Sequence, residues 1–307
     1  VQGWNATSPS DLTIDPDDTS DVHGHGTRVA GTVGAATNNG TGIAAVGWNA
    51  RIMPIRVTNR IDGVASSSDM ARGLTWAADN GAHVANMSYQ SWRHSTVQSA
   101  ARYFRSKGGV VFGSAGNSGS DAGLSPTPDV IVVTATGTND SHASWADYGA
   151  YVDLAAPGDY IETTRDNASY GQVRGTSFSS PIAAAVSALV MSANPQLTPD
   201  QVQQILFDSA ADLGAAGWDP YYGWGRINAA NAVSMAWSQE TDRESPVVAF
   251  VSPDPGATVE GTVQVKVSAE DNVKVTRIDL YADGIKIGSA DTAPAEFSWD
   301  SSDMMSG

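Results

Sequence analysis

The chain has 307 residues, enough for one large α/β domain and a smaller second domain. Its 33 acidic and 17 basic residues give a formal net charge of −16, which opposes binding to nucleic acids and to anionic membranes. Cysteine is absent, so disulfide bonds are excluded, and no apolar run approaches the length that suggests a membrane span.

The first chemically informative segment is His23–Thr32, in which two histidines precede a Gly- and Ala-rich helical start. A histidine at such a position can act as a general base. From the residues alone, His23 and His25 are both candidates, and a helix-capping or core histidine is the alternative interpretation.

An acidic run lies directly before these histidines. Pro9 and Pro16 predict an irregular loop there and not a strand, so we expect a solvated loop or a cation site. Its carboxylates are Asp11, Asp15, Asp17, Asp18 and Asp21.

Further along the chain, β-like runs alternate with helix-like stretches. The predicted strands are Ile52–Val57, His83–Met87, Val110–Phe112 and Val130–Thr134. The predicted helices are Ser68–Asn80, Ser95–Lys107, Thr176–Ala193 and Pro199–Ser209. This alternation is typical of βαβ units, so we expect an α/β fold with a doubly wound parallel sheet flanked by helices.

Two segments among these elements suggest acyl-transfer chemistry. The glycine-rich turn Gly113–Gly119 presents Asn117, whose amide could donate to an oxyanion, although Asn is also common in turns at positive φ. The segment Gly175–Pro181 leads into an apolar helix and places Ser177 in its first turn. Free backbone N–H groups and the helix dipole favour negative charge there, which suits a nucleophile; a simple capping serine is the alternative.

In the order and spacing of these motifs, residues 1 to 236 resemble the subtilisin-like serine proteases, or subtilases. Supporting segments are Asn38–Ala44, Arg51–Val57, Val84–Ser88, Asp153–Gly158 and Tyr222–Ala229. The resemblance implies a serine endopeptidase with Ser177 as nucleophile and Asn117 as oxyanion donor. The family's histidine directly precedes Gly-Thr, which selects His25 as the general base.

The family's third catalytic residue is an aspartate at the end of an early strand, followed by Ser-Gly or Thr-Gly, and no such segment lies upstream of His25. Val1–Asn5 resembles the segment that follows that strand, so we expect the chain to begin downstream of the aspartate. With no strand before it, the acidic run is not expected to supply a replacement. We predict that the 307-residue chain alone is inactive or nearly so, since losing this aspartate in another subtilase costs on the order of 10⁴ in turnover.

The resemblance also implies a metal loop and a substrate cleft. No cofactor is needed for catalysis, but a structural Ca²⁺ would take the Asn39 side chain and the Thr41 and Ile43 carbonyls, with Asn39 as a plain turn residue in the alternative interpretation. The substrate-binding residues are expected to be Ser88, Tyr89, Gln90, Ser114, Ala115 and Gly116. Because Gln90 stands where the family usually has glycine, we expect it to narrow the pocket for the residue before the scissile bond.

Near Glu240–Pro246 the pattern changes to short alternating strands. We therefore expect a peptidase-like domain over residues 1–240 that lacks its N-terminal strand, and a partial, bacterial Ig-like β-sandwich over residues 245–307. Its predicted strands are Val247–Val251, Thr262–Ala269, Arg277–Ala282 and Ile285–Ser289, with a hairpin turn at Asp283-Gly284.

Other functions stay open at this point. A non-catalytic subtilase-like binding or scaffold module would explain the missing aspartate, and in a surface protein the Ig-like part would carry the function. Retention of Ser177, His25 and Asn117 in their motifs favours the enzyme. By family resemblance we expect a secreted, extracellular monomer acting on proteins or peptides.

Overall fold

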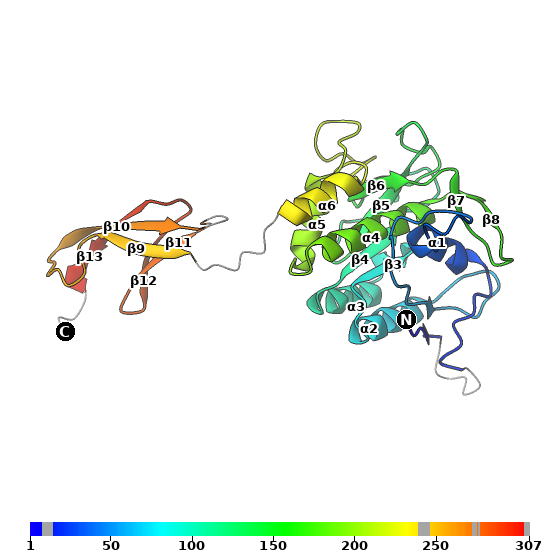
Figure 1. Ribbon diagram of the computed structural model, residues 1–307, viewed down its shortest axis with the longest axis horizontal. Helices are drawn as coiled ribbons and strands as arrows, with labels where there is room; N and C mark the ends of the chain where they lie inside the picture. The colour runs from blue at the N-terminus through cyan, green and yellow to red at the C-terminus, as the bar shows by residue number, and fades with distance from the viewer. Residues whose placement is uncertain (8–14, 239–245, 272–274, 276, 304–307) are drawn as a thin grey trace. The chain divides into compact units, whose positions relative to one another are not determined.

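The computed structural model describes residues 1–7, 15–238, 246–271, 275 and 277–303 (Figure 1). Asp11 and Pro9 of the acidic run lie outside the described residues. The chain divides into two units, Val1–Gln239 and Glu240–Gly307.

A four-stranded parallel sheet forms the centre of the larger unit. Its strand order is β3 (Val84–Met87), β4 (Val110–Ser114), β5 (Ile131–Thr136) and β6 (Leu154–Pro157). A separate parallel pair consists of β1 (Trp4–Asn5) and β2 (Ile55–Arg56), and an antiparallel pair of β7 (Ile161–Thr164) and β8 (Tyr170–Val173). Every residue of β4 and β5 is buried, as expected for strands covered on both faces.

Helices pack on both faces of this sheet (Figure 1). Val111 and Val132 point into a core shared with α2 (Ser67–Asp79) and α3 (Ser95–Ser106). Their sequence neighbours on β4 and β5 point into the opposite core, because side chains alternate across a strand. That second core contains α4 (Thr176–Ala193), α5 (Pro199–Asp208) and α6 (Ala229–Ser238). The doubly wound parallel sheet is confirmed.

Helix α4 runs through the core of the unit. Contrary to the expectation from the sequence, it is long and apolar enough to cross a membrane by length and composition, but 67% of it is buried inside the unit. Burial of small side chains on all sides is typical of a core helix. Helix α1 (His25–Gly34) packs against α4 and β7, so the predicted histidine and serine segments lie side by side.

The smaller unit is made of antiparallel strands. One sheet has the order β13 (Ala295–Asp300), β10 (Thr262–Glu270), β9 (Val247–Ser252), and a hairpin joins β11 (Ile278–Ala282) to β12 (Ile285–Ala290). Asp283 and Gly284 both have positive φ, as a two-residue hairpin turn requires. A short 3₁₀ turn, Ser301–Asp303, follows β13. The all-β character predicted for this part of the chain is confirmed.

Candidate active site

Ser177 is the second residue of α4 and is half-buried. Pro181, four residues further on, has no N–H group, so the helix cannot donate a hydrogen bond to the Ser177 carbonyl. The hydroxyl of Ser88 donates to that carbonyl instead, at 2.7 Å. The start of α4 is therefore fixed by a side chain from the segment that follows β3, and Ser88 lies directly beside the candidate nucleophile.

Asn117 is held by the same helix start. Its Oδ1 accepts hydrogen bonds from the backbone N–H of Thr176 at 2.9 Å and from the Thr176 hydroxyl at 3.0 Å. With the amide oriented in this way, a Cβ atom at Gly175 would lie 3.7 Å from Asn117 Nδ2 and 3.7 Å from the backbone N of Ser177. Two nitrogen atoms from distant segments thus lie near one point beside Gly175, together with a ring carbon of Phe178, and the φ of 144° at Gly175 favours glycine.

The turn that carries Asn117 is anchored by the buried carboxylate of Asp147, a residue that no sequence motif predicts. Asp147 Oδ1 accepts from the backbone N–H groups of Ser118, at 2.6 Å, and Ser120, at 3.3 Å. Asp147 Oδ2 accepts from the Gln90 side chain at 3.2 Å. Asp147 lies in a loop 30 residues after the turn it anchors and belongs to none of the quoted motifs, so only the tertiary fold reveals this role.

His25 is the first residue of α1, and its half-buried ring lies 5.8 Å from the ring of Phe178, the residue after Ser177. Burial lowers the pKa of His25 below its ordinary value, His23 lowers it further, Asp21 opposes the change, and Arg28 adds to it. No hydrogen bond joins His25 to Ser177 within the described part of the chain. Catalytic hydrogen bonds are often long in unliganded enzymes, so this geometry is compatible with a base and nucleophile pair.

None of the described aspartates before His25 donates or accepts a hydrogen bond with its ring. Asp15 caps the backbone of Asp17, and Asp18 pairs with Arg56 at 2.7 Å. Asp21 accepts its hydrogen bonds from the loop and from the first turn of α1. The expectation of a solvated loop therefore fits all of the described carboxylates in this run.

The six predicted substrate-binding residues gather around Ser177 and the Asn117 turn. Tyr89 donates its hydroxyl proton to the Gly63 carbonyl at 2.8 Å. Gln90 Nε2 donates to the Ala115 carbonyl and covers Gly116, where an added Cβ would lie 2.1 Å from that amide. Ser114 and Ala115 are only 3% and 0% exposed, and the side chains that contact their carbonyls include Trp92 at Ser114 and Gln90 at Ala115.

The predicted calcium loop offers a limited set of ligands. Asn39 Oδ1 accepts a hydrogen bond from the Thr41 backbone N–H at 3.0 Å, which is the plain turn geometry considered from the sequence. Within the described residues, no group of three or more His, Asp or Glu side chains is placed to hold a metal ion. Since Ca²⁺ takes 6–8 oxygen ligands, the neutral oxygens of Asn39, Thr41 and Ile43 do not complete a site by themselves.

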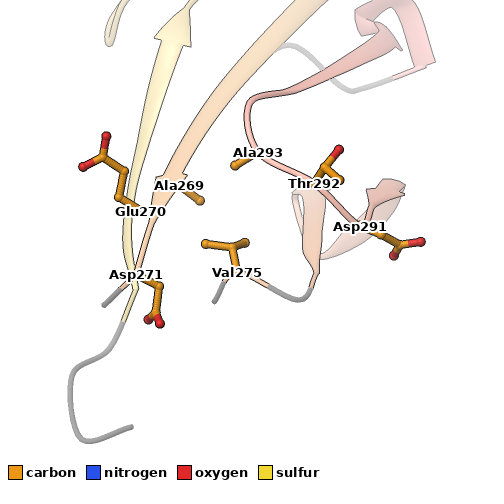
Figure 2. Close-up of a pocket in the computed structure, with 7 residues that line it drawn as sticks. All are labelled: Ala269, Glu270, Asp271, Val275, Asp291, Thr292 and Ala293. Atoms are coloured by element: carbon orange, nitrogen blue, oxygen red, sulfur yellow. The ribbon is translucent and has the colours of Figure 1, made fainter. Parts of the chain in front are cut away.

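The smaller unit contains a shallow pocket of about 500 Å³. Figure 2 shows the carboxylates of Glu270 and Asp291 on opposite sides of this pocket, directed away from each other. Its lining residues are Ala269, Glu270, Asp271, Val275, Asp291, Thr292 and Ala293. The diverging carboxylates do not form a metal centre, and the pocket lies in a different unit from the candidate active site.

The sequence of the aromatic turn Trp218–Gly225, after α5, favours core packing over a ligand-binding cage. In the structure Trp218, Tyr221 and Trp224 are 39%, 44% and 44% exposed, so core packing describes them only in part. The Trp218 indole N–H donates to the Val152 carbonyl, and Tyr221 stacks on Tyr148. These contacts fix the turn on the surface of the unit.

Comparison with known proteins identifies the families that the two parts of the chain match. Residues 4–225 match the model of the subtilase family, and residues 246–307 match that of a bacterial Ig domain. The chain is 38% identical over 220 residues to a thermophilic serine proteinase of Bacillus sp. (strain AK1), covering 71% of this chain and 54% of that protein. It is 37% identical over 214 residues to subtilisin BL of Lederbergia lenta, covering 69% of this chain and 78% of the relative.

Solved structures show the same fold. A protease of Pseudoalteromonas arctica superimposes with a TM-score of 0.67 at 30% identity, over 77% of this chain and 84% of its own. The epidermin leader peptide processing serine protease of Staphylococcus aureus gives a TM-score of 0.68 at 20% identity, over 76% of this chain and 70% of its own. The chain spans about half the length of the thermophilic serine proteinase. Its 222 residues that match the family model, 4 to 225, make up most of the chain. On this combined evidence of motifs, fold and sequence identity, the chain belongs to the subtilase family.

Proposed function

We propose that this protein is a serine endopeptidase in which Ser177 is the nucleophile, His25 the general base and Asn117 an oxyanion donor. The position of Asn117 Nδ2 and the Ser177 backbone N near one point beside Gly175, with the Asn117 oxygen turned toward the Thr176 N–H, carries this proposal. Two preorganised donors at that point would stabilise the negative oxygen of a tetrahedral intermediate.

The proposed reaction is acyl transfer. His25 accepts the hydroxyl proton of Ser177 as its oxygen attacks the peptide carbonyl carbon, and the carbonyl oxygen becomes the bound oxyanion. Collapse of this intermediate breaks the peptide bond, and the leaving amine takes the proton from His25. Water, activated by His25, then hydrolyses the acyl-enzyme and regenerates Ser177. The exposed face of Asn117 and the half-buried Ser177 support access for a protein or peptide chain.

The catalytic aspartate is proposed to lie on a strand upstream of residue 1. Two observations on the described strands support this: β2 pairs only with β1, and β3 is an edge of its parallel sheet. Met53, Ile55 and Val57 nevertheless pack in the same core as β3, so β2 and β3 flank one hydrophobic cluster without pairing with each other. A parallel strand between β2 and β3 would join the two sheets. Its carboxyl end would lie beside the carboxyl end of β3, which Ser88 follows.

Fluorophosphonate labelling tests the proposal. We expect the protein expressed with its upstream coding sequence to be labelled at Ser177, as mapped by peptide mass spectrometry. The 307-residue chain and the Ser177→Ala variant of the extended protein are expected to stay unlabelled. Absence of labelling in an extended protein that is shown to be folded would exclude the hydrolase and favour the non-catalytic module.

We also propose that Gln90 restricts the side chain accepted before the scissile bond. Its amide bridges Ala115 and Asp147 across the wall formed by residues 114–116, which leaves little room for a large side chain. Gln90→Gly in the extended protein is expected to raise kcat/KM for a Phe-containing substrate relative to the Ala analogue by roughly 10- to 200-fold. Gln90→Ala is expected to give a smaller rise. An unchanged Phe/Ala ratio in a variant that still cleaves the Ala substrate would contradict this role.

Four expectations based on the family stay within the proposal. An extracellular location is inferred from family resemblance, as are the monomeric state and the absence of a catalytic cofactor. Structural Ca²⁺ would need carboxylates in addition to the oxygens of Asn39, Thr41 and Ile43, and the upstream segment is where the family places them.

A further inference from the structure

Asp21 makes an unusual set of contacts for an exposed carboxylate. Its Oδ1 accepts from the backbone N–H groups of His23, at 3.0 Å, and Gly24, at 2.7 Å. Its Oδ2 accepts from the backbone N–H of Thr27 at 2.7 Å and from the Thr27 hydroxyl at 2.8 Å. The donors of these four hydrogen bonds belong to residues that precede and follow His25 in the sequence. Asp21 therefore fixes the backbone that presents this ring.

The reason that Asp21 has this role lies in the N-cap residue, which directly precedes α1. The N-cap is Gly24, with φ of 83°, and it has no side chain to cap the helix. A Cβ at that position would also lie 2.8 Å from Asp166 Oδ2, so a capping Ser or Asp is disfavoured there. The first turn contains no acidic residue. Asp21, three residues before the N-cap, satisfies the orphan N–H group of Thr27 in its place.

The charge of Asp21 also acts on His25. A protonated imidazole at the first position of a helix is disfavoured by the helix dipole, and burial, His23 and Arg28 all lower the pKa of His25. Asp21 opposes them. Partial burial alone would raise the pKa of Asp21, but hydrogen bonds from Thr27, His23 and Gly24 outweigh it and lower the pKa to about 2, so the carboxylate is charged at neutral pH.

Other charged groups face this region without the same contacts. A Cβ at Gly24 would lie 2.8 Å from Asp166 Oδ2 and 3.2 Å from Arg28 Nη2, so both groups lie near this N-cap, and Glu162 on β7 is exposed. Tyr89 lies close enough for Asp21 to raise its pKa, although burial contributes more to that change. Helix α4, the other element packed on α1, carries no charged side chain. Asp21 is thus the carboxylate whose hydrogen bonds hold the backbone around His25 and whose charge raises the pKa of that histidine.

We infer that Asp21 is a positioning residue, which holds the start of α1 so that His25 faces Ser177 and which stabilises the protonated ring that forms during acyl transfer. This inference rests on the proposed function of His25. It assigns to Asp21 a role different from that of the catalytic aspartate, because its carboxylate oxygens are engaged by backbone and Thr27 donors.

An NMR titration of the 307-residue chain tests this role without requiring activity. In Asp21→Asn the pKa of His25 is expected to be lower than in the unmodified chain, because a negative charge is lost. Asp166→Asn is the matched control, since it removes a neighbouring carboxylate, and it is expected to leave the pKa of His25 in place. In Asp21→Ala, amide exchange at Gly24 and Thr27 is expected to be about tenfold faster or more.

The extended protein supplies a second readout. Asp21→Asn is expected to lower kcat more than it changes KM, and to move the acid limb of the kcat/KM profile to lower pH. An unaltered His25 pKa and acid limb in Asp21→Asn would overturn the inference, as would unchanged exchange in Asp21→Ala. If Ser177 is not labelled although the His25 pKa shifts as expected, the proposed function fails while the role of Asp21 at His25 is supported.

Discussion

His25→Ala in the upstream-extended protein is expected to lower kcat by about 10⁶-fold, the size of loss measured when the base or nucleophile of another subtilase is removed. The loss is large because without the imidazole Ser177 has no acceptor for its proton, and no other described base lies at the start of α4. Initial rates on a chromogenic peptide, with active-site titration of the unmodified protein, measure it.

His23→Ala is the matched control for this substitution. His23 is exposed on the same loop, and its ring lies 6.1 Å from that of His25. The variant is expected to keep its turnover within severalfold. Because His23 lowers the pKa of His25, its removal is expected to raise that pKa and to move the acid limb of the pH profile upward. Equal losses in the two variants would contradict the choice of His25 as the base.

The helices of the larger unit were predictable because their signals are local. The run Thr176–Ala193 matches α4 in full, and Ser95–Lys107 differs from α3 by one residue. Continuous apolar side chains predicted β4 and β5 in the same way. In contrast, the predicted strand Ile52–Val57 contracts to two paired residues, because strand length depends on a partner, and β1 offers only Trp4 and Asn5.

Short strands with weak local signals were missed. β6 contains two alanines and a proline and is a strand because it pairs with β5, from Val133 to Thr136. The β7–β8 pair also depends on a distant segment. Thr163 and Thr164 donate their hydroxyl protons to carbonyls at the start of α1. Such contacts between distant segments are not encoded in a window of sequence.

In the candidate site, too, features with a local sequence signal were predictable and features that depend on distant contacts were not. Motif context predicted Ser177, His25 and Asn117 as its members, and the structure brings their segments to one place. The supporting contacts could not be predicted, because the residues that provide them, Asp147 and Asp21, belong to no motif. From the sequence, Asp21 is expected to belong to a solvated loop or a cation site, and it is rejected as a substitute for the catalytic aspartate. Its helix-capping role depends on the left-handed backbone of Gly24, which the sequence does not display.

Asn117→Ala is expected to lower kcat in the extended protein by about 10²–10³-fold, or about 2.7–4 kcal/mol, with little change in KM; this is the loss measured for the oxyanion amide of a subtilisin. The split between kcat and KM follows because the amide would bind the oxygen strongly only after it becomes an oxyanion. Steady-state kinetics on one peptide substrate measure both constants.

Two further variants separate the donor from its support. Ser118→Ala, which keeps the backbone N–H bound by Asp147, is expected to retain normal kcat. Thr176→Val removes one of the two hydrogen bonds that orient the Asn117 amide, and also the bond that the Thr176 hydroxyl accepts from the Gly116 backbone N–H, but it keeps the Thr176 backbone donor, so an intermediate loss is expected. If Thr176→Val were as damaging as Asn117→Ala while the latter raised KM, Asn117 would act through the shape of its turn. A hydrogen bond from Asn117 to the developing oxyanion predicts losses confined to kcat. These losses should increase from Ser118→Ala through Thr176→Val to Asn117→Ala.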